Sequence, residues 1–134
     1  MDYYQSAFGK FNPQGDPHVA VKFILNILVS EERFSDLLCL LTDGNQIGAL
    51  EGVPGWIIER RRINASGAID YFSEWPKDAK FHAYVDPSEF ELASPSMFMN
   101  EDTFHGFVRL AINAYSEKNT SKSDYVEKVS NLLH

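Results

Sequence analysis

The side chains best suited to chemistry are carboxylates gathered in one central segment. Residues 70–102 carry eight acids against Lys77 and Lys80, a net charge of −6, whereas the whole 134-residue chain carries −7. Like charges gathered on one surface raise the local potential and steer a basic partner toward it. They also disfavour direct binding of nucleic acid, whose phosphates require Lys or Arg. A solvated acidic face that only aids solubility is the alternative interpretation.

Large aromatic residues are interleaved with these acids. Buried aromatic anchors usually contribute more affinity than charges do, although the same residue types also dominate ordinary cores. The candidates for either role are Trp75, Tyr84, Phe90 and Phe98.

The run Met97 to Met99 stands directly before the acids Glu101 and Asp102. We expect Met97 and Phe98 to pack into the domain and the two acids to begin a helix at the surface. Carboxylates beside apolar anchors are typical of an interface. The predicted partner-binding residues are Asp70, Glu74, Trp75, Asp78, Asp86, Glu89, Glu91, Glu101 and Asp102.

No familiar catalytic, phosphate-binding or metal-binding motif occurs in the sequence: it contains no GxGxxG, P-loop, CxxC, HExxH or GxSxG pattern. Asp70 and Glu74 form a carboxylate pair only in principle, and solvent exposure is the simpler interpretation. His105 is expected to be a surface or capping residue. Cys39 lies in the apolar run SDLLCLLTDG and is expected to be a buried, inert thiol. The sequence therefore predicts a protein that is not an enzyme and needs no cofactor and no metal; an enzyme without a familiar motif is the alternative.

Length and composition indicate one domain spanning residues 1–134. Hydrophobic residues make up 44% of the chain and charged residues 23%, as in ordinary globular proteins. No secretory signal is visible, and the longest apolar run, VAVKFILNILV, is too short to span a bilayer. These features predict a cytoplasmic protein that does not bind membranes.

Two helices are expected in the N-terminal third. Residues 1–15 hold Gly9, Pro13 and Gly15 and are predicted to be a loop. Asp16 and Pro17 suit the start of a helix, so residues 17–29 favour helix, with a buried strand left open. Ser30 is expected to cap a second helix, whose apolar stripe is Phe34, Leu37, Leu38 and Leu41.

The central part is expected to form a small, mostly antiparallel sheet. WIIERRRI and AIDYFSEW, separated by NASG, are typical of a hairpin. FHAYV alternates, which places Phe81, Ala83 and Val85 on one face and His82 and Tyr84 on the other. FEL and MFM could add short strands. The three arginines of ERRRI are expected to form ion pairs with part of residues 70–102.

Two helices are expected at the C-terminal end. Asn100 is a suitable N-cap, and apolar residues then recur at helical spacing from Phe104 to Tyr115. Ser121 and Asp124 resemble a capping box before a short final helix. Helices, a sheet and then helices predict an α+β domain.

The segment VDPSEFELASPSMFMNEDTFHGFVRLAINAYSEKN, residues 85–119, resembles the small immunity proteins of bacterial contact-dependent growth-inhibition systems, above all partners of ribonuclease toxins. The resemblance is clearest in SPSMFMNEDTF and FVRLAINAY; the rest of the chain is similar only in size and acidity. It implies a cytoplasmic protein that binds and neutralises the C-terminal nuclease domain of a toxin. A ribonuclease cleft is normally electropositive, so the acidic segment agrees with that role. A small acidic adaptor or regulator with a non-nuclease partner is the alternative.

Overall fold

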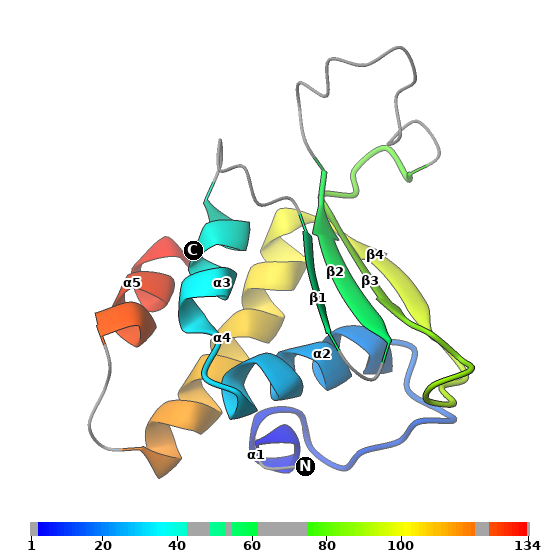
Figure 1. The fold of residues 1–134 in the computed structure, drawn as a ribbon, viewed down its shortest axis with the longest axis horizontal. Coiled ribbons are helices and arrows are strands. Elements are labelled where there is room, and N and C mark those ends of the chain that lie inside the picture. Colours follow the sequence, from blue (N-terminus) through cyan, green and yellow to red (C-terminus); the bar gives the residue numbers. More distant parts are fainter. Residues whose placement is uncertain (1–2, 43–48, 53–54, 62–74, 120–123, 134) are drawn as a thin grey trace.

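The computed structural model describes residues 3–42, 49–52, 55–61, 75–119 and 124–133, and these form helices packed on one antiparallel sheet (Figure 1). The helices are α1 (Tyr4–Phe8), α2 (Val19–Ser30), α3 (Phe34–Leu41), α4 (Glu101–Lys118) and α5 (Asp124–Leu132). The strands are β1 (Ala49–Gly52), β2 (Trp56–Arg60), β3 (Phe81–Val85) and β4 (Ser96–Met99). The expected α+β class is confirmed, although three helices precede the sheet where two were expected.

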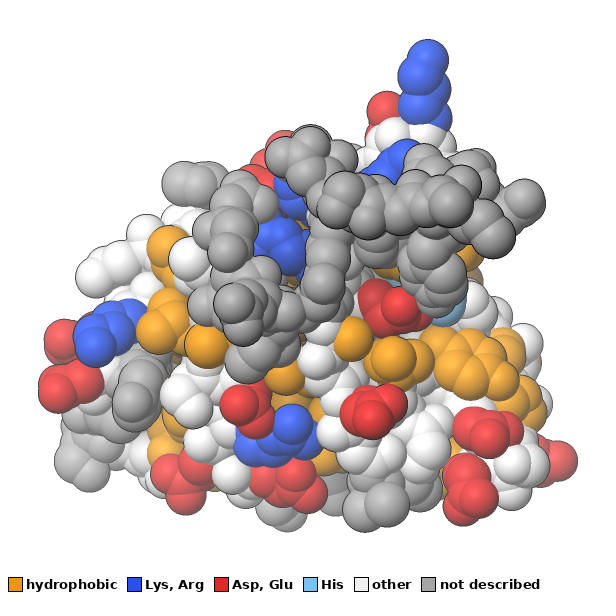
Figure 2. Space-filling model, turned by 45° about the horizontal axis from the view of Figure 1, so that its top comes forward, with side chains coloured by type: hydrophobic (Ala, Val, Ile, Leu, Met, Phe, Trp, Pro, Cys, Tyr) orange, Lys and Arg blue, Asp and Glu red, His pale blue; other side chains and the backbone are white. Residues whose placement is uncertain are grey.

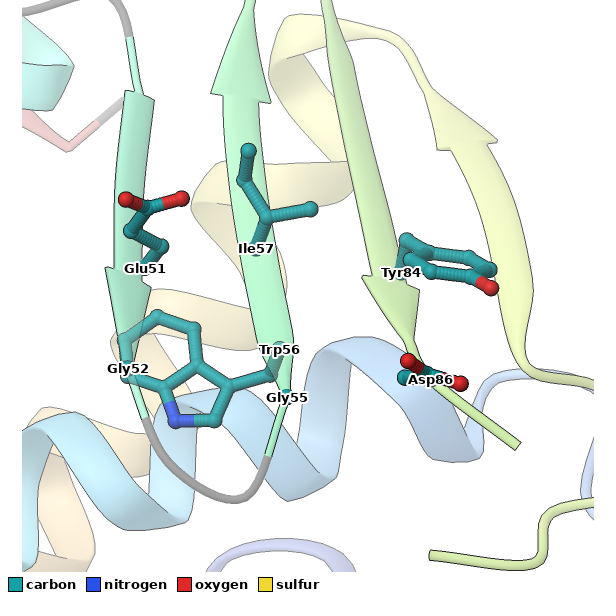
Figure 3. A pocket seen from close by; sticks show the side chains of 7 residues that line it. All are labelled: Glu51, Gly52, Gly55, Trp56, Ile57, Tyr84 and Asp86. Carbon is teal, nitrogen blue, oxygen red and sulfur yellow. The ribbon is translucent and has the colours of Figure 1, made fainter. Parts of the chain in front are cut away.

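The sheet has the strand order β1-β2-β3-β4, and every neighbouring pair is antiparallel. Side chains alternate between two faces, and one face packs against α2 and α4. Figure 3 shows these helices behind the sheet. The buried residues on this inner face are Leu50, Trp56, Ile58, Arg60, Phe81, Ala83, Val85 and Met99.

Helix α1 lies inside the segment 1–15 that was expected to be a loop. Its Tyr4 is only 1% exposed, and the Tyr4 ring meets the rings of Phe8 and Phe11 edge-on, at 5.4 and 5.2 Å between centroids. A five-residue helix is too short to be stable alone, so these aromatic contacts and packing against α4 must hold it. The glycines and proline that predicted a loop begin only after Phe8.

The open question about residues 17–29 is settled, because α2 is a helix. Its expected start was wrong by two residues, since the N-cap position is His18. Asp16 instead accepts hydrogen bonds from the backbone N–H of His18 (2.9 Å) and from Nζ of Lys22 (2.7 Å). Asp16 therefore stabilises the turn before the helix, and these two partners lower its pKa against the opposing effect of desolvation.

The expected cap at Ser30 is also wrong, because Ser30 is the last residue of α2. Helix α3 begins at Phe34, and the chain reverses at Glu32, whose φ of 54° lies in the left-handed region. The carboxylate of Glu32 accepts a hydrogen bond from the hydroxyl of Tyr115 on α4 at 2.9 Å. This long-range contact accompanies the turn and has no local signal in the sequence.

The central strands follow the sequence pattern in part. FHAYV forms β3 with the expected alternation, and MFM lies within β4. FEL is not a strand, and β1 was not expected. The first half of the predicted hairpin contains β2, whereas its second half lies outside the described residues except for Trp75.

Helix α4 begins as expected, since Oδ1 of Asn100 accepts a hydrogen bond from the backbone N–H of Thr103 at 2.8 Å. The Phe104 ring packs on that of Phe81, with 4.2 Å between centroids, and this contact joins α4 to the sheet. His105 was expected at the surface but is only 4% exposed. The predicted capping box at Ser121 and Asp124 lies mostly outside the described residues. No helix in the described ranges has the length and apolar character needed to cross a bilayer.

The two edges of the sheet differ. At β1, helix α3 packs against the strand, and a guanidinium N–H of Arg33 donates to the backbone oxygen of Glu51 at 3.4 Å. At β4, Val85 N–H donates to Pro95 O, so Ser96 and Phe98 turn their backbone groups away from the sheet. Within the described part of the chain no strand lies beyond β4, and β4 contains no charged residue (Figure 1).

Candidate docking surface

The face of the sheet opposite the helices carries the candidate site, and we call it the outer face. Its floor mixes aromatic, aliphatic and acidic side chains, and Figure 3 shows Ile57 and Tyr84 pointing out from this side. Phe98 is 38% exposed, one of the two large hydrophobic residues described as exposed. The residues of the outer face are Glu51, Ile57, Glu59, His82, Tyr84, Ser96 and Phe98.

Ring contacts organise one side of this floor. The His82 imidazole stacks on the Phe98 ring, with 4.3 Å between centroids and 19° between planes. Trp75 meets both rings edge-on, at 5.6 and 5.2 Å. Trp75 is only 8% exposed, so it supports the other two rings, and Phe98 is the most exposed ring of these three. Phe90, another expected anchor, packs against Phe23 at 4.6 Å between centroids and belongs to the core.

The first group of predicted acids, Asp86, Glu89 and Glu91, lies in the loop that follows β3. Asp86 N–H donates to Gly55 O at 2.7 Å, and Oδ1 of Asp86 accepts from the backbone N–H and the hydroxyl of Ser88, both at 2.9 Å. These bonds to Ser88 lower the pKa of Asp86, so the carboxylate stays charged. We call this set the lower acidic group.

A hollow of about 360 Å³ opens beside the lower acidic group, on the outer face (Figure 3). Gly55, with φ of 47°, permits the close approach, because a Cβ there would lie 2.9 Å from Cγ of Glu89 and 3.0 Å from Cβ of Asp86. The hollow is lined by Glu51, Gly52, Gly55, Trp56, Ile57, Tyr84 and Asp86.

The second group of predicted acids, Asp78, Glu101 and Asp102, lies at the opposite end of β3 and β4. A smaller hollow of about 180 Å³ lies between Asp78 of this group and the exposed ring of Phe98. Its lining residues are Pro76, Asp78, Ala79, Phe98, Met99 and Asn100. We call Asp78, Glu101 and Asp102 the upper acidic group.

The structure therefore does not gather the predicted acids into one cluster. The two groups are separated by the length of β3, about 15 Å at 3.3 Å per residue. They lie at the two ends of the aromatic floor, and Figure 2 shows acidic side chains on the border of a hydrophobic patch. Asp70 and Glu74 lie outside the described residues.

Among the described residues, no ion pair joins Arg60 or Arg61 to the acidic segment, contrary to expectation, and Arg62 lies outside them. Arg61 donates to the backbone oxygens of Pro76 and Ala79, at 3.3 and 3.4 Å, and so binds carbonyl groups. Arg60 is buried and donates to Leu40 O at 2.7 Å; burial lowers its pKa, and the nearby charge of Glu101 partly offsets this. Within the described ranges, six predicted acids form no ion pair: Asp78, Asp86, Glu89, Glu91, Glu101 and Asp102.

Sequence reasoning missed the polar residues of the floor. Glu59, His82 and Ser96 come from three different strands, and a hydrogen-bonded chain connects them across the sheet. Their contact depends on the register of β2, β3 and β4, which no local pattern specifies.

Comparisons with protein-family models, with curated proteins and with solved structures gave no match. In the part of the chain that the structure describes, no group of three or more His, Cys, Asp or Glu is arranged to hold a metal ion. The chemistry of the outer face is therefore the basis for a functional proposal.

Proposed function

We propose that this chain is an immunity protein that binds and neutralises the ribonuclease domain of a contact-dependent growth-inhibition toxin. The observation that supports this role most is the exposed Phe98 ring on the outer face, with carboxylates at both ends of that face that form no ion pair within the described residues. In this proposal the partner is a basic protein, and the protein acts by binding without catalysis and needs no cofactor.

Electrostatic attraction is the first contribution to binding. A nuclease cleft must be positive to hold a polyanion, so carboxylates that lack internal partners attract it over a distance of about 10 Å at 0.1 M salt. The upper and lower acidic groups fit within one footprint, because a standard interface of about 800 Å² per partner is about 30 Å across. The separation of the two groups is thus compatible with a single docking site.

Apolar contact is the second contribution. Phe98 is exposed on the edge strand β4, and its ring packs against His82 and Trp75. An aromatic side chain that is already fixed loses little rotamer freedom on binding. It is therefore the residue of the outer face best suited to be a hot spot.

Association kinetics test the electrostatic part. The partner is the C-terminal domain of the toxin encoded next to this gene, and the rate is measured from 0.05 to 0.5 M salt. We expect the double variants Glu89→Lys with Glu91→Lys, and Asp78→Lys with Asp102→Lys, each to slow association about tenfold at low salt. The control is Glu127→Lys on α5, an exposed acid outside both acidic groups. Equal slowing by the control, or a rate independent of salt, contradicts steering by this face.

Dissociation kinetics test the apolar part. Phe98 and Leu110 are both large, hydrophobic and exposed, at 38% and 46%, but Leu110 lies on α4. We expect Phe98→Ala to raise the Kd at least tenfold through faster dissociation, and Leu110→Ala to leave it unchanged. If the two variants behave alike, the outer face is not the docking site.

A further inference from the structure

A nucleophile, a base and a carboxylate form one hydrogen-bonded chain across the outer face. Oγ of Ser96 on β4 lies 2.7 Å from Nε2 of His82 on β3. Nδ1 of the same ring lies 3.2 Å from Oε1 of Glu59 on β2. Serine, histidine and a carboxylate in this order are the groups of acyl-transfer enzymes, which are recognised by geometry and roles rather than by sequence position.

The positions of the protons follow from the partners. A carboxylate accepts hydrogen bonds only, so a neutral His82 that faces ionised Glu59 carries its proton on Nδ1. Nε2 then has a free lone pair and accepts a hydrogen bond from the Ser96 hydroxyl. The geometry thus selects the tautomer in which His82 can remove the proton of Ser96.

We propose that Ser96 is an activated nucleophile, with His82 as its base and Glu59 as the positioning residue that selects the tautomer. The three strands hold the chain in place, because Glu59 and His82 are direct cross-strand partners. Stacking on Phe98 further fixes the plane of the imidazole. This activity is separate from toxin binding and requires no partner protein.

The surroundings of Ser96 indicate the class of substrate. Ser96 lies opposite Tyr84 in the register of β3 and β4, and Tyr84 lines the larger hollow. Glu51 and Asp86 also line that hollow and disfavour an anionic substrate. The site therefore fits an uncharged or cationic ester with an aromatic or other apolar group.

The reaction balances without any further reactant except water. Oγ of Ser96 attacks the ester carbonyl carbon while its proton passes to Nε2 of His82. The C–O bond to the leaving group then breaks, the leaving group takes the proton, and an acyl ester of Ser96 remains. Water, deprotonated by His82, attacks that ester, which releases the carboxylic acid and restores the Ser96 hydroxyl.

Covalent labelling tests the proposal with the full chain. A neutral alkyl fluorophosphonate forms a P–O bond with an activated serine and releases fluoride, and peptide mapping locates the adduct. We expect one adduct, on Ser96, that is absent in Ser96→Ala. Ser88→Ala is the matched control, because Ser88 is an exposed serine whose hydroxyl donates to Asp86. Hydrolysis of p-nitrophenyl acetate is expected to be slower in Ser96→Ala, the variant without the adduct, than in the unaltered chain.

Two further readouts separate activation from a merely structural role. General-base help contributes about 10²–10⁴-fold, so His82→Gln is expected to slow labelling at least 100-fold while the protein stays folded by circular dichroism. Nitrogen NMR is expected to show the His82 proton on Nδ1, with loss of this preference in Glu59→Gln. No adduct on Ser96 at pH 8, or equally fast labelling of His82→Gln, overturns the proposal.

Discussion

Gly52 is the position at which a single added methyl group gives the sharpest test of the packing. Gly52 lies opposite Trp56 in the register of β1 and β2. A Cβ at Gly52 would lie 2.7 Å from Cζ2 and 2.9 Å from Cε2 of the Trp56 indole. These distances are well inside the roughly 3.5–4.0 Å at which carbon atoms pack favourably. The indole is buried, and the Arg33 guanidinium lies 5.4 Å from its centroid.

The expected loss of stability follows from two opposing effects. Overpacking of a filled site costs about 1–3 kcal/mol. Replacing Gly by Ala also restricts the unfolded chain, which returns about 0.4–1 kcal/mol. We therefore expect Gly52→Ala to lower the free energy of unfolding by about 1–2 kcal/mol. For 134 residues this corresponds to a decrease in Tm of about 4–7 °C.

Urea denaturation followed by circular dichroism measures this change, with Gly106→Ala as the control. Gly106 lies within α4, and a Cβ there would meet nothing within 4 Å. We expect this control to raise stability by about 0.5–1 kcal/mol, because Ala is the better helix former. If Gly52→Ala is as stable as the unaltered chain, the close contact with Trp56 is wrong. Stabilisation by both substitutions would mean that backbone entropy outweighs packing at β1.

Two other substitutions test local contacts. Asn100→Ala removes the hydrogen bond to the Thr103 N–H and is expected to lower the free energy of unfolding by about 1 kcal/mol, measured by urea denaturation. An unchanged free energy of unfolding would contradict the role of Asn100 as a helix cap. Tyr4→Phe removes a buried hydroxyl that has no hydrogen-bond partner within the described residues, so stability at pH 7 is expected to stay equal or rise by up to about 1 kcal/mol. Burial, with a smaller effect of the Asp16 charge, raises the pKa of Tyr4 to about 12 from 10.0. The unfolded chain therefore releases the Tyr4 proton at lower pH than the folded chain. The unaltered protein is expected to lose stability between pH 10 and 12 to a greater extent than Tyr4→Phe. If the plots of unfolding free energy against pH run parallel for the two proteins, this expectation is contradicted.

The elements with long or strictly alternating patterns were predictable from the sequence. Helix α4 combines a polar cap at Asn100 with an apolar stripe repeated over several turns, and β3 alternates without interruption. Short elements held by distant contacts were not predictable. Helix α1 depends on aromatic packing, and α2 extends through Ser30 although a serine there is typical of a cap.

The candidate site was predictable in composition but not in arrangement. The charges of residues 70–102 could be anticipated from types and order, but Phe98 was expected to pack into the domain and is instead 38% exposed. The division of the acids into two groups could not be anticipated. It depends on how β3 and β4 run, because Asp86 follows one end of this strand pair and Asp102 follows the other. The contact between Glu59 and Ser96 through His82 likewise requires the register of three strands.

The unequal edges of the sheet bear on the behaviour of the protein at high concentration. The β4 edge offers backbone donors and acceptors on a strand without charged side chains, which is the kind of edge along which sheets of separate molecules join. At pH 7 the net charge of −7 keeps two copies apart. Near the sequence pI of about 5.0 that repulsion vanishes. Molecules are then expected to pair edge to edge along β4 and form larger sheets. Acidic buffers are therefore the conditions in which the purified protein is expected to precipitate first.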